Sequence, residues 1–262
     1  MILSRIAKAL RDQNWFAVAI EFTIVVAGVV IGFQVSQWAD NRALDQRREA
    51  ALERLHDEAE QIVAYHRSHV DLHARMNALR TEAIERLIAN DWADANRAEM
   101  AQGLNSVGIL PAAYPPRTVY DELVSAGEFA NIGSPDLRTA ISAYHAQLTF
   151  LQGQIDYVRD LIEDPLQVGQ PGARVVYVPG TERERRWQFD FDSLSQDEAF
   201  LQRLLLGNNL QRAVTGWTRE ALAAALTMCE ALAEATRRPC QPPEAQSRLD
   251  RGAAPDAAEK DP

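Results

Sequence analysis

The stretch from residue 15 to residue 38 is strongly apolar, and its one ionisable side chain is the carboxyl group of Glu21. At about 100° per residue, Gly28 and Gly32 fall on the same face of a helix as Glu21. Two small residues four positions apart allow two helix backbones to approach closely in lipid. This face therefore predicts association between helices, with helix flexibility or lipid packing as the alternative.

The carboxyl group of Glu21 has three possible roles. A charge inside a bilayer is costly, so we expect this group to be protonated, paired with a partner or turned toward the interface. It is a tolerated residue near the interface, a hydrogen-bonding contact inside an oligomer, or a carboxyl that handles ions or protons with a partner membrane protein. The sequence leaves all three open.

The apolar stretch itself predicts a transmembrane helix over residues 15–38. At about 1.5 Å per residue it spans about 36 Å, which is enough to cross a hydrocarbon core of about 30 Å. Trp15 and Trp38 suit the two interfaces between water and lipid. Residues 1–14 form a short basic tail, and the apolar run is too long for a typical signal peptide. This layout is typical of a signal-anchor, with residues 1–14 cytoplasmic and residues 39–240 outside the cytoplasm, although the opposite orientation stays open.

Three histidines at helical spacing, His66, His69 and His73, lie on one side of a predicted helix. Together they could ligate a divalent metal, or become charged near about pH 6 and loosen a packed face. No acidic residue shares their register, so we favour a structural role. In that interpretation His69 is a hydrogen-bonded core residue, and the other two are solvated.

The two cysteines, Cys229 and Cys240, show no CxxC or Cys/His metal pattern, so neither a structural zinc nor another cofactor is expected. They could form one disulfide if the domain lies outside the cytoplasm. The chain contains no phosphate-binding glycine loop and no hydrolase or metalloprotease motif, so an enzyme is not expected. The net charge of −10 argues against nucleic acid as a partner.

The fold is predicted to be all-α, with the membrane helix continuing into a long-helix bundle. Residues 41–90 contain no proline or glycine and carry an apolar stripe at period seven. The stripe consists of Leu55, Ile62, His69, Met76 and Ala83, flanked by Leu44, Ala51, Tyr65, Leu72 and Leu79. A long helix over residues 196–237 is its expected antiparallel partner, with Ser195 and Glu198 as a capping box. A short β-hairpin is possible near residues 173–191, and residues 241–262 are expected to be disordered.

A helix–turn–helix corner is expected in the middle of the chain. Residues 117–126 are predicted to form a helix closed by Gly127, and a second helix begins after Ser134 and runs to about residue 164. Tyr120, Glu122 and Arg138 fall at this corner. They either line a pocket or are hydrogen-bonded corner residues, and we favour the second role.

Two blocks of the sequence, IEFTIVVAGVVIGFQVSQWADNR and PPRTVYDELVSAGEFANIGSPDLRTAISAYH, resemble an uncharacterised family of bacterial single-span membrane proteins. In that family a Glu opens the span, a Gln and a Trp close it, and a Tyr-x-Glu-Leu-x-Ser-x-Gly stretch precedes a Leu–Arg helix. The matching positions here are Glu21, Gln34, Trp38, Tyr120, Glu122, Leu123, Ser125, Gly127, Leu137, Arg138 and Tyr144. The resemblance implies a single-pass protein of the bacterial inner membrane with a periplasmic helical domain, and it implies no activity.

The predicted function is that of a membrane-anchored interaction or scaffold component of the bacterial envelope. Its expected partners are the lipid bilayer and further copies of the same chain, with another membrane protein as a further candidate. Two other functions remain open. The chain could be a helical module that senses a ligand or pH, or an accessory subunit of an ion-driven membrane complex that uses Glu21.

Overall fold

The computed structural model describes residues 15–92, 97–162, 166, 169–180 and 185–243. The predicted basic tail, residues 1–14, lies outside the described residues, as does all of the predicted disordered tail after residue 243. The chain divides into two compact units, Met1–Ala51 and Leu52–Pro262, and the division falls within helix α2 (Trp15–Ala89). Of the described residues, 77% are helical and two short strands pair in an antiparallel sheet, which confirms the predicted all-α class with a short hairpin.

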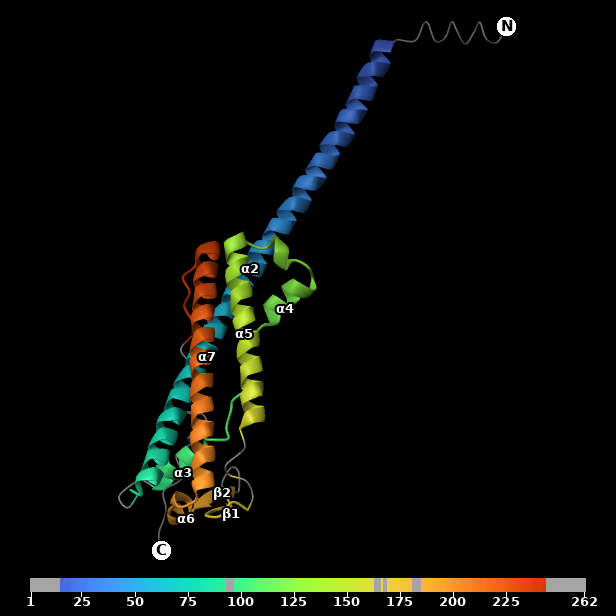
Figure 1. Ribbon diagram of the computed structural model, residues 1–262. Helices are drawn as coiled ribbons and strands as arrows, with labels where there is room; N and C mark the ends of the chain where they lie inside the picture. Colours follow the sequence, from blue (N-terminus) through green and yellow to red (C-terminus); the bar gives the residue numbers. More distant parts are fainter. Residues whose placement is uncertain (1–14, 93–96, 163–165, 167–168, 181–184, 244–262) are drawn as a thin grey trace, which may run out of the picture. The chain divides into compact units, whose positions relative to one another are not determined.

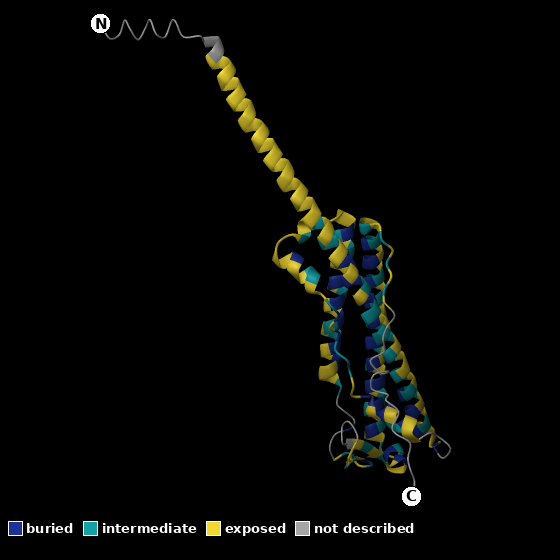
Figure 2. Ribbon diagram, turned by 180° about the vertical axis from the view of Figure 1, so that it is seen from behind, coloured by how far each residue is buried: buried dark blue, intermediate teal, exposed yellow. Residues whose placement is uncertain are grey.

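In the first unit, the part of α2 between residues 18 and 47 is exposed at every position. Large apolar side chains such as Phe22 and Phe33 are 69% and 63% exposed. Figure 2 shows this part of the helix in the colour of exposed residues along its described length. Its most apolar 18-residue window has a mean hydropathy of 2.2, and none of that window is buried. By length and composition, α2 is therefore apolar enough to cross a membrane.

The core of the second unit is formed by residues 52–89 of α2 together with α5 (Pro135–Leu161) and α7 (Glu198–Thr236). Figure 1 shows α5 and α7 side by side along their length. Side-chain hydrogen bonds connect His56 to Thr236 and Asn77 to Thr215. The first members of these pairs rise along α2 while the second members fall along α7. The two helices are therefore antiparallel, as the sequence predicted.

The buried stripe on α2 has the predicted period of seven, but the residues buried beside it are not the predicted ones. Leu55, Ile62 and Ala83 are buried as expected, whereas the predicted flank from Leu44 to Leu79 is exposed or only half-buried. The flank that is buried lies four residues after each stripe position and consists of Ala59, His66, His73, Arg80 and Leu87. Three polar residues therefore occupy positions that coiled-coil spacing usually gives to apolar side chains.

A second part of the core lies where α2 ends. There α3 (Arg97–Asn105), α6 (Phe191–Ser195) and the hairpin of β1 (Ala173–Tyr177) and β2 (Arg185–Phe189) come together around buried apolar side chains (Figure 1). Ala173 pairs with Phe189 in the antiparallel register. A Cβ atom on Gly103 would collide with the backbone at Leu79, so α3 needs a glycine where it crosses α2.

The ends of the helices follow from local sequence. Ser134 accepts a hydrogen bond from the backbone N–H of Leu137 at the start of α5, and Gly127 has a φ of +72° just after α4 (Thr118–Ser125). The predicted start of the last long helix was wrong. Asp197, and not Ser195, is the N-cap of α7, because its carboxylate accepts from the N–H of Phe200. Ser195 instead ends the short helix α6.

Candidate functional site

Glu58 is a buried carboxylate on α2 that caps another helix. Its two carboxylate oxygens accept hydrogen bonds from the backbone N–H groups of Val119 (2.7 Å) and Tyr120 (3.1 Å), in the first turn of α4. The N-cap residue of α4, Arg117, supplies no capping bond of its own. A helix N-terminus carries unpaired N–H groups and the positive end of the helix dipole. Glu58, which belongs to α2, accepts hydrogen bonds from two of these N–H groups and places a negative charge beside the dipole.

The corner residues singled out by the sequence have partners close to the corner. Glu122 forms a two-bond ion pair with Arg54 of α2, with 3.1 Å between Nη1 and Oε1, and this hydrogen bonding lowers the pKa of Glu122. Arg138 donates to the carbonyl oxygens of Ile132 and Gly133, both at 2.9 Å. Arg138 thus forms hydrogen bonds within the corner, whereas Glu122 connects α4 to α2.

Beside the corner, aromatic and imidazole rings fill the space between α2, α4 and α5. Tyr120 stacks on His145 with 3.4 Å between ring centroids, and His66 Nε2 lies 3.1 Å from the hydroxyl of the buried Tyr144. Neither ring nitrogen of His145 has a hydrogen-bond partner among the described residues. Burial lowers the pKa of His66 and of His145 to about 4 in each case, so both rings are neutral at pH 7.

The three histidines of α2 are arranged differently from the prediction. His66 and His73 are buried, with 0% and 5% exposure, whereas His69 is half-buried and donates from Nδ1 to the carbonyl oxygen of Tyr65. The assignment of His69 to the core and of the other two to solvent was therefore wrong, because α2 buries the flank that contains His66 and His73. Among the described residues, no group of three His, Cys, Asp or Glu side chains is placed to hold a metal ion.

Arg80 is buried at 1% exposure and is held by neutral oxygens. It donates to Asn77 Oδ1, to the carbonyl and hydroxyl oxygens of Ser106 (3.3 and 3.4 Å), and to Asn208 Oδ1 (3.4 Å). Among the described residues no carboxylate lies within ion-pair distance of it. Burial lowers the pKa of Arg80 to about 10, so it stays charged at neutral pH. The second unit thus contains a buried positive charge whose hydrogen bonds reach only neutral groups.

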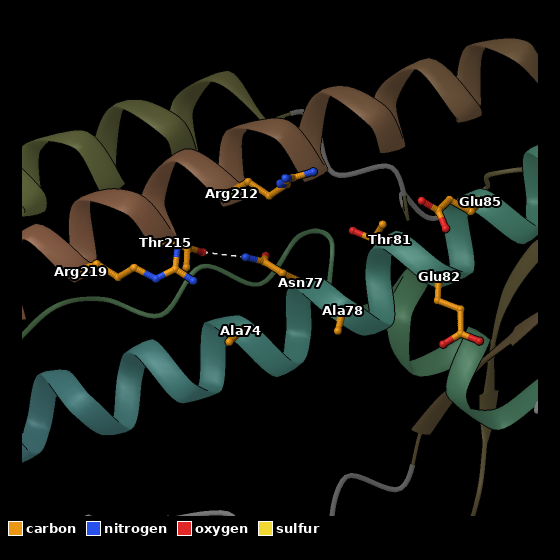
Figure 3. Close-up of a pocket in the computed structure, with 9 residues that line it drawn as sticks. All are labelled: Ala74, Asn77, Ala78, Thr81, Glu82, Glu85, Arg212, Thr215 and Arg219. Carbon is orange, nitrogen blue, oxygen red and sulfur yellow. Dashed lines mark hydrogen bonds between the residues drawn. The ribbon is translucent and has the colours of Figure 1, made fainter.

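A groove of about 580 Å³ lies between α2 and α7 beside this arginine (Figure 3). From α2 it is lined by Ala74, Asn77, Ala78, Thr81, Glu82 and Glu85, and from α7 by Arg212, Thr215 and Arg219. Asn77 Nδ2 donates to Thr215 Oγ1 at 2.8 Å across the groove, which is the dashed contact in Figure 3. The sequence analysis missed this site. The sequence signal for the groove was the pair Arg212 and Arg219, which lie seven residues apart on one helix face. Such a pair normally indicates a solvated face.

On the face of α2 that the sequence predicted to associate, Glu21, Gly28 and Gly32 are exposed, and a Cβ atom added to either glycine meets nothing within 4 Å. Gln34 is also exposed. Trp38 is 62% exposed, and the guanidinium group of Arg42 lies 5.4 Å from the centroid of its ring. The face is therefore open along both glycines.

The C-terminal end of the second unit is fixed to the first turns of α2 in that unit. A disulfide joins Cys229 to Cys240, whose Cα atoms are 5.7 Å apart. Next to it, Arg238 pairs with Asp57 at 2.6 Å and approaches Glu53 and Glu60 at 3.6 and 3.7 Å. These contacts hold the chain after α7 against α2.

Comparisons of the sequence with protein-family models and with curated proteins, and of the structure with solved structures, find no match. The class of protein therefore follows from the fold and the sites alone: a helical domain attached to an exposed, strongly apolar helix.

Proposed function

We propose that this chain is a single-pass membrane protein of the bacterial envelope that presents its helical domain outside the cytoplasm as an interaction or scaffold component. The observation that carries the proposal is the exposure of residues 18–38. A helix segment with a mean hydropathy of 2.2 and no buried residue has no protein core to cover it, so a lipid phase is its natural environment. The bacterial assignment rests on the resemblance of the two sequence blocks to the single-span family.

The orientation is supported by two features that belong to different parts of the chain. Arg5, Lys8 and Arg11 precede an apolar run that is too long for a typical signal peptide, which is the layout of a signal-anchor. The second unit holds the disulfide between Cys229 and Cys240, and structural disulfides persist outside the reducing cytoplasm. Both features favour a cytoplasmic N-terminus and a periplasmic domain.

Self-association through the membrane helix is part of the proposal. Gly28 and Gly32 leave an open face on which a second backbone can approach, and Glu21 lies on the same face, where a partner helix can satisfy its carboxyl group. A scaffold that associates in this way presents several copies of the helical domain at one place on the membrane.

The orientation is tested in intact cells by the state of the two cysteines. Free thiols are blocked with a membrane-permeable maleimide before lysis, and the protein is then probed with and without a reductant. In the periplasm, Cys229 and Cys240 are protected by their disulfide and become reactive only after reduction. Reaction of both thiols in unreduced cells would contradict the proposed orientation. Protease treatment of intact spheroplasts is an independent check, because a periplasmic domain is digested without opening the inner membrane.

A second candidate function, a ligand-responsive module, is favoured by one observation, the polar groove between α2 and α7. Ligand binding and anchoring are compatible, since the groove lies wholly within the second unit.

A further inference from the structure

The groove between α2 and α7 exists because small side chains line one of its walls. Ala74 and Ala78 stand on α2 at a spacing of one helical turn, with Thr81 one turn further on. These side chains are too short to fill the space opposite α7. The long side chains of Arg212 and Arg219 extend from α7 along the other wall (Figure 3). The result is an open groove of about 580 Å³, a size typical of sites for small molecules.

The two arginines of the groove are available to a ligand. Both are exposed, and neither forms a hydrogen bond or ion pair with another described residue. Seven residues apart on one helix, they share a face and stand about 10 Å apart along the axis. A guanidinium group binds one carboxylate or phosphate through two parallel hydrogen bonds. Two such groups along one wall therefore match a ligand with two separated anionic groups.

The base of the groove is polar and positive. Asn77 donates to Thr215, and its amide oxygen accepts from the buried Arg80, so the positive charge of Arg80 lies directly behind the groove. The carboxylate of Glu82 is paired with Arg86 at 3.0 Å. Of the two acidic residues that line the groove, only Glu85 opposes the charges of Arg212 and Arg219 without an ion-pair partner among the described residues. The balance of charge at the site favours an anion.

We propose that the groove binds a small, elongated molecule that carries two anionic groups, carboxylates or phosphates, one held by Arg212 and the other by Arg219. Thr81 and Asn77 supply hydrogen bonds to the part of the ligand between them. The site lies within one unit and does not rest on the proposed membrane anchoring. Failure of ligand binding therefore leaves the anchoring proposal intact, and failure of anchoring leaves the ligand proposal intact.

The test uses the full-length chain in an uncharged detergent and measures binding by titration calorimetry with three probes. Citrate represents carboxylates, diphosphate represents phosphates, and acetate is the control with one charge. We expect citrate or diphosphate to bind about tenfold or more tightly than acetate, because only they can engage both guanidinium groups. Which of the two binds more tightly identifies the anionic group that the site prefers.

Variants separate the groove from general attraction to a positive surface. Arg212→Gln and Arg219→Gln are each expected to weaken binding of the preferred probe about tenfold, and they leave the fold intact because both side chains are exposed. Arg67→Gln removes an exposed arginine of α2 outside the groove and should change the affinity less than about twofold. Equal affinities for the three probes, equal losses in all three variants, or no binding of citrate and diphosphate would each overturn the proposal.

Discussion

Two segments of helix α2 have opposite relations between polarity and burial. In residues 18–38 most side chains are apolar and all are exposed, as Phe22 and Phe33 illustrate. In residues 55–87 the buried flank includes His66, His73 and Arg80, which are polar and no more than 5% exposed. The same backbone geometry therefore serves two kinds of environment.

The two segments need different surroundings. Burial of polar groups is tolerated when they are hydrogen-bonded, and the second unit supplies partners such as the hydroxyl of Tyr144 for His66 and Asn208 for Arg80. The apolar segment has no such internal partner surface, and water around it costs roughly 25 cal/mol for each Å² of apolar area. The first segment therefore depends on something outside the chain, and the second depends on its own tertiary contacts.

The largest expected effect comes from making the exposed apolar segment polar. The double variant Val26→Arg, Val30→Arg places two charges near the centre of the span, each at a cost of about 2.5–3.5 kcal/mol. We expect the protein to leave the membrane pellet on alkaline carbonate extraction. The control, Gln61→Arg with Asp71→Arg, adds the same residues at exposed positions of the second segment and should stay in the membrane. Equal retention of both variants would remove the contrast between the two segments.

The next effect concerns a buried polar group of the second segment. Glu58→Ala leaves the N–H groups of Val119 and Tyr120 without their acceptor, and we expect the free energy of unfolding to fall by about 2–3 kcal/mol. Urea denaturation followed by circular dichroism measures the change. Glu58→Gln keeps one acceptor oxygen and should lose less, while Asp71→Ala, on the exposed side of α2, should lose almost nothing. A loss as small as that of Asp71→Ala would show that the cap contributes no stability.

Local signals predicted the elements well. Ser134 located the start of α5, Gly127 marked the end of α4, and the hairpin expected near residues 173–191 is formed by β1 and β2. Each depends on backbone chemistry within a few residues, which is why the sequence alone was sufficient. The period-seven stripe likewise identified α2 as a helix packed against others.

Tertiary partners decided what the sequence could not. A period-seven stripe can bury the positions on either side of it, and His66, His73 and Arg80 made the correct side look solvent-exposed. The burial of His66 and Arg80 depends on Tyr144, Ser106 and Asn208, which come from distant parts of the chain. The groove was missed for a similar reason, because it depends on which side chains of α7 face the alanines of α2.

The third effect uses the buried histidines and depends on pH. His145 has a pKa of about 4 in the folded protein and about 6.5 when unfolded, so below pH 6.5 the unfolded chain binds a proton that the folded chain does not. Proton binding by His145 therefore favours the unfolded state, and the free energy of unfolding decreases as the pH falls from about 6.5 to about 4. Arg117 and Asp121 are the charged groups that influence the ring, and burial outweighs both.

His145→Phe tests this dependence because it keeps an aromatic ring stacked on Tyr120 and removes the titration. At pH 7.5 the variant should match the wild type within about 1 kcal/mol, and at pH 5 it should be more stable by about 2 kcal/mol. Urea denaturation at both pH values measures the difference. An unchanged slope for His145→Phe would mean that this histidine is not what couples acid to unfolding.

The smallest expected effect returns to the exposed segment and asks whether a second copy of the chain covers part of it. Gly28→Leu fills a face that is open in the single chain, so it costs no contact within the chain itself. In a dimer it separates the two backbones, and we expect association in lipid vesicles to weaken about fivefold, or about 1 kcal/mol, as measured by energy transfer between labelled copies. Ala27→Leu enlarges a neighbouring position about a third of a turn from that face and should change association much less. If the two variants associate equally, the apolar segment meets lipid on all sides, and the only partner it requires is the bilayer.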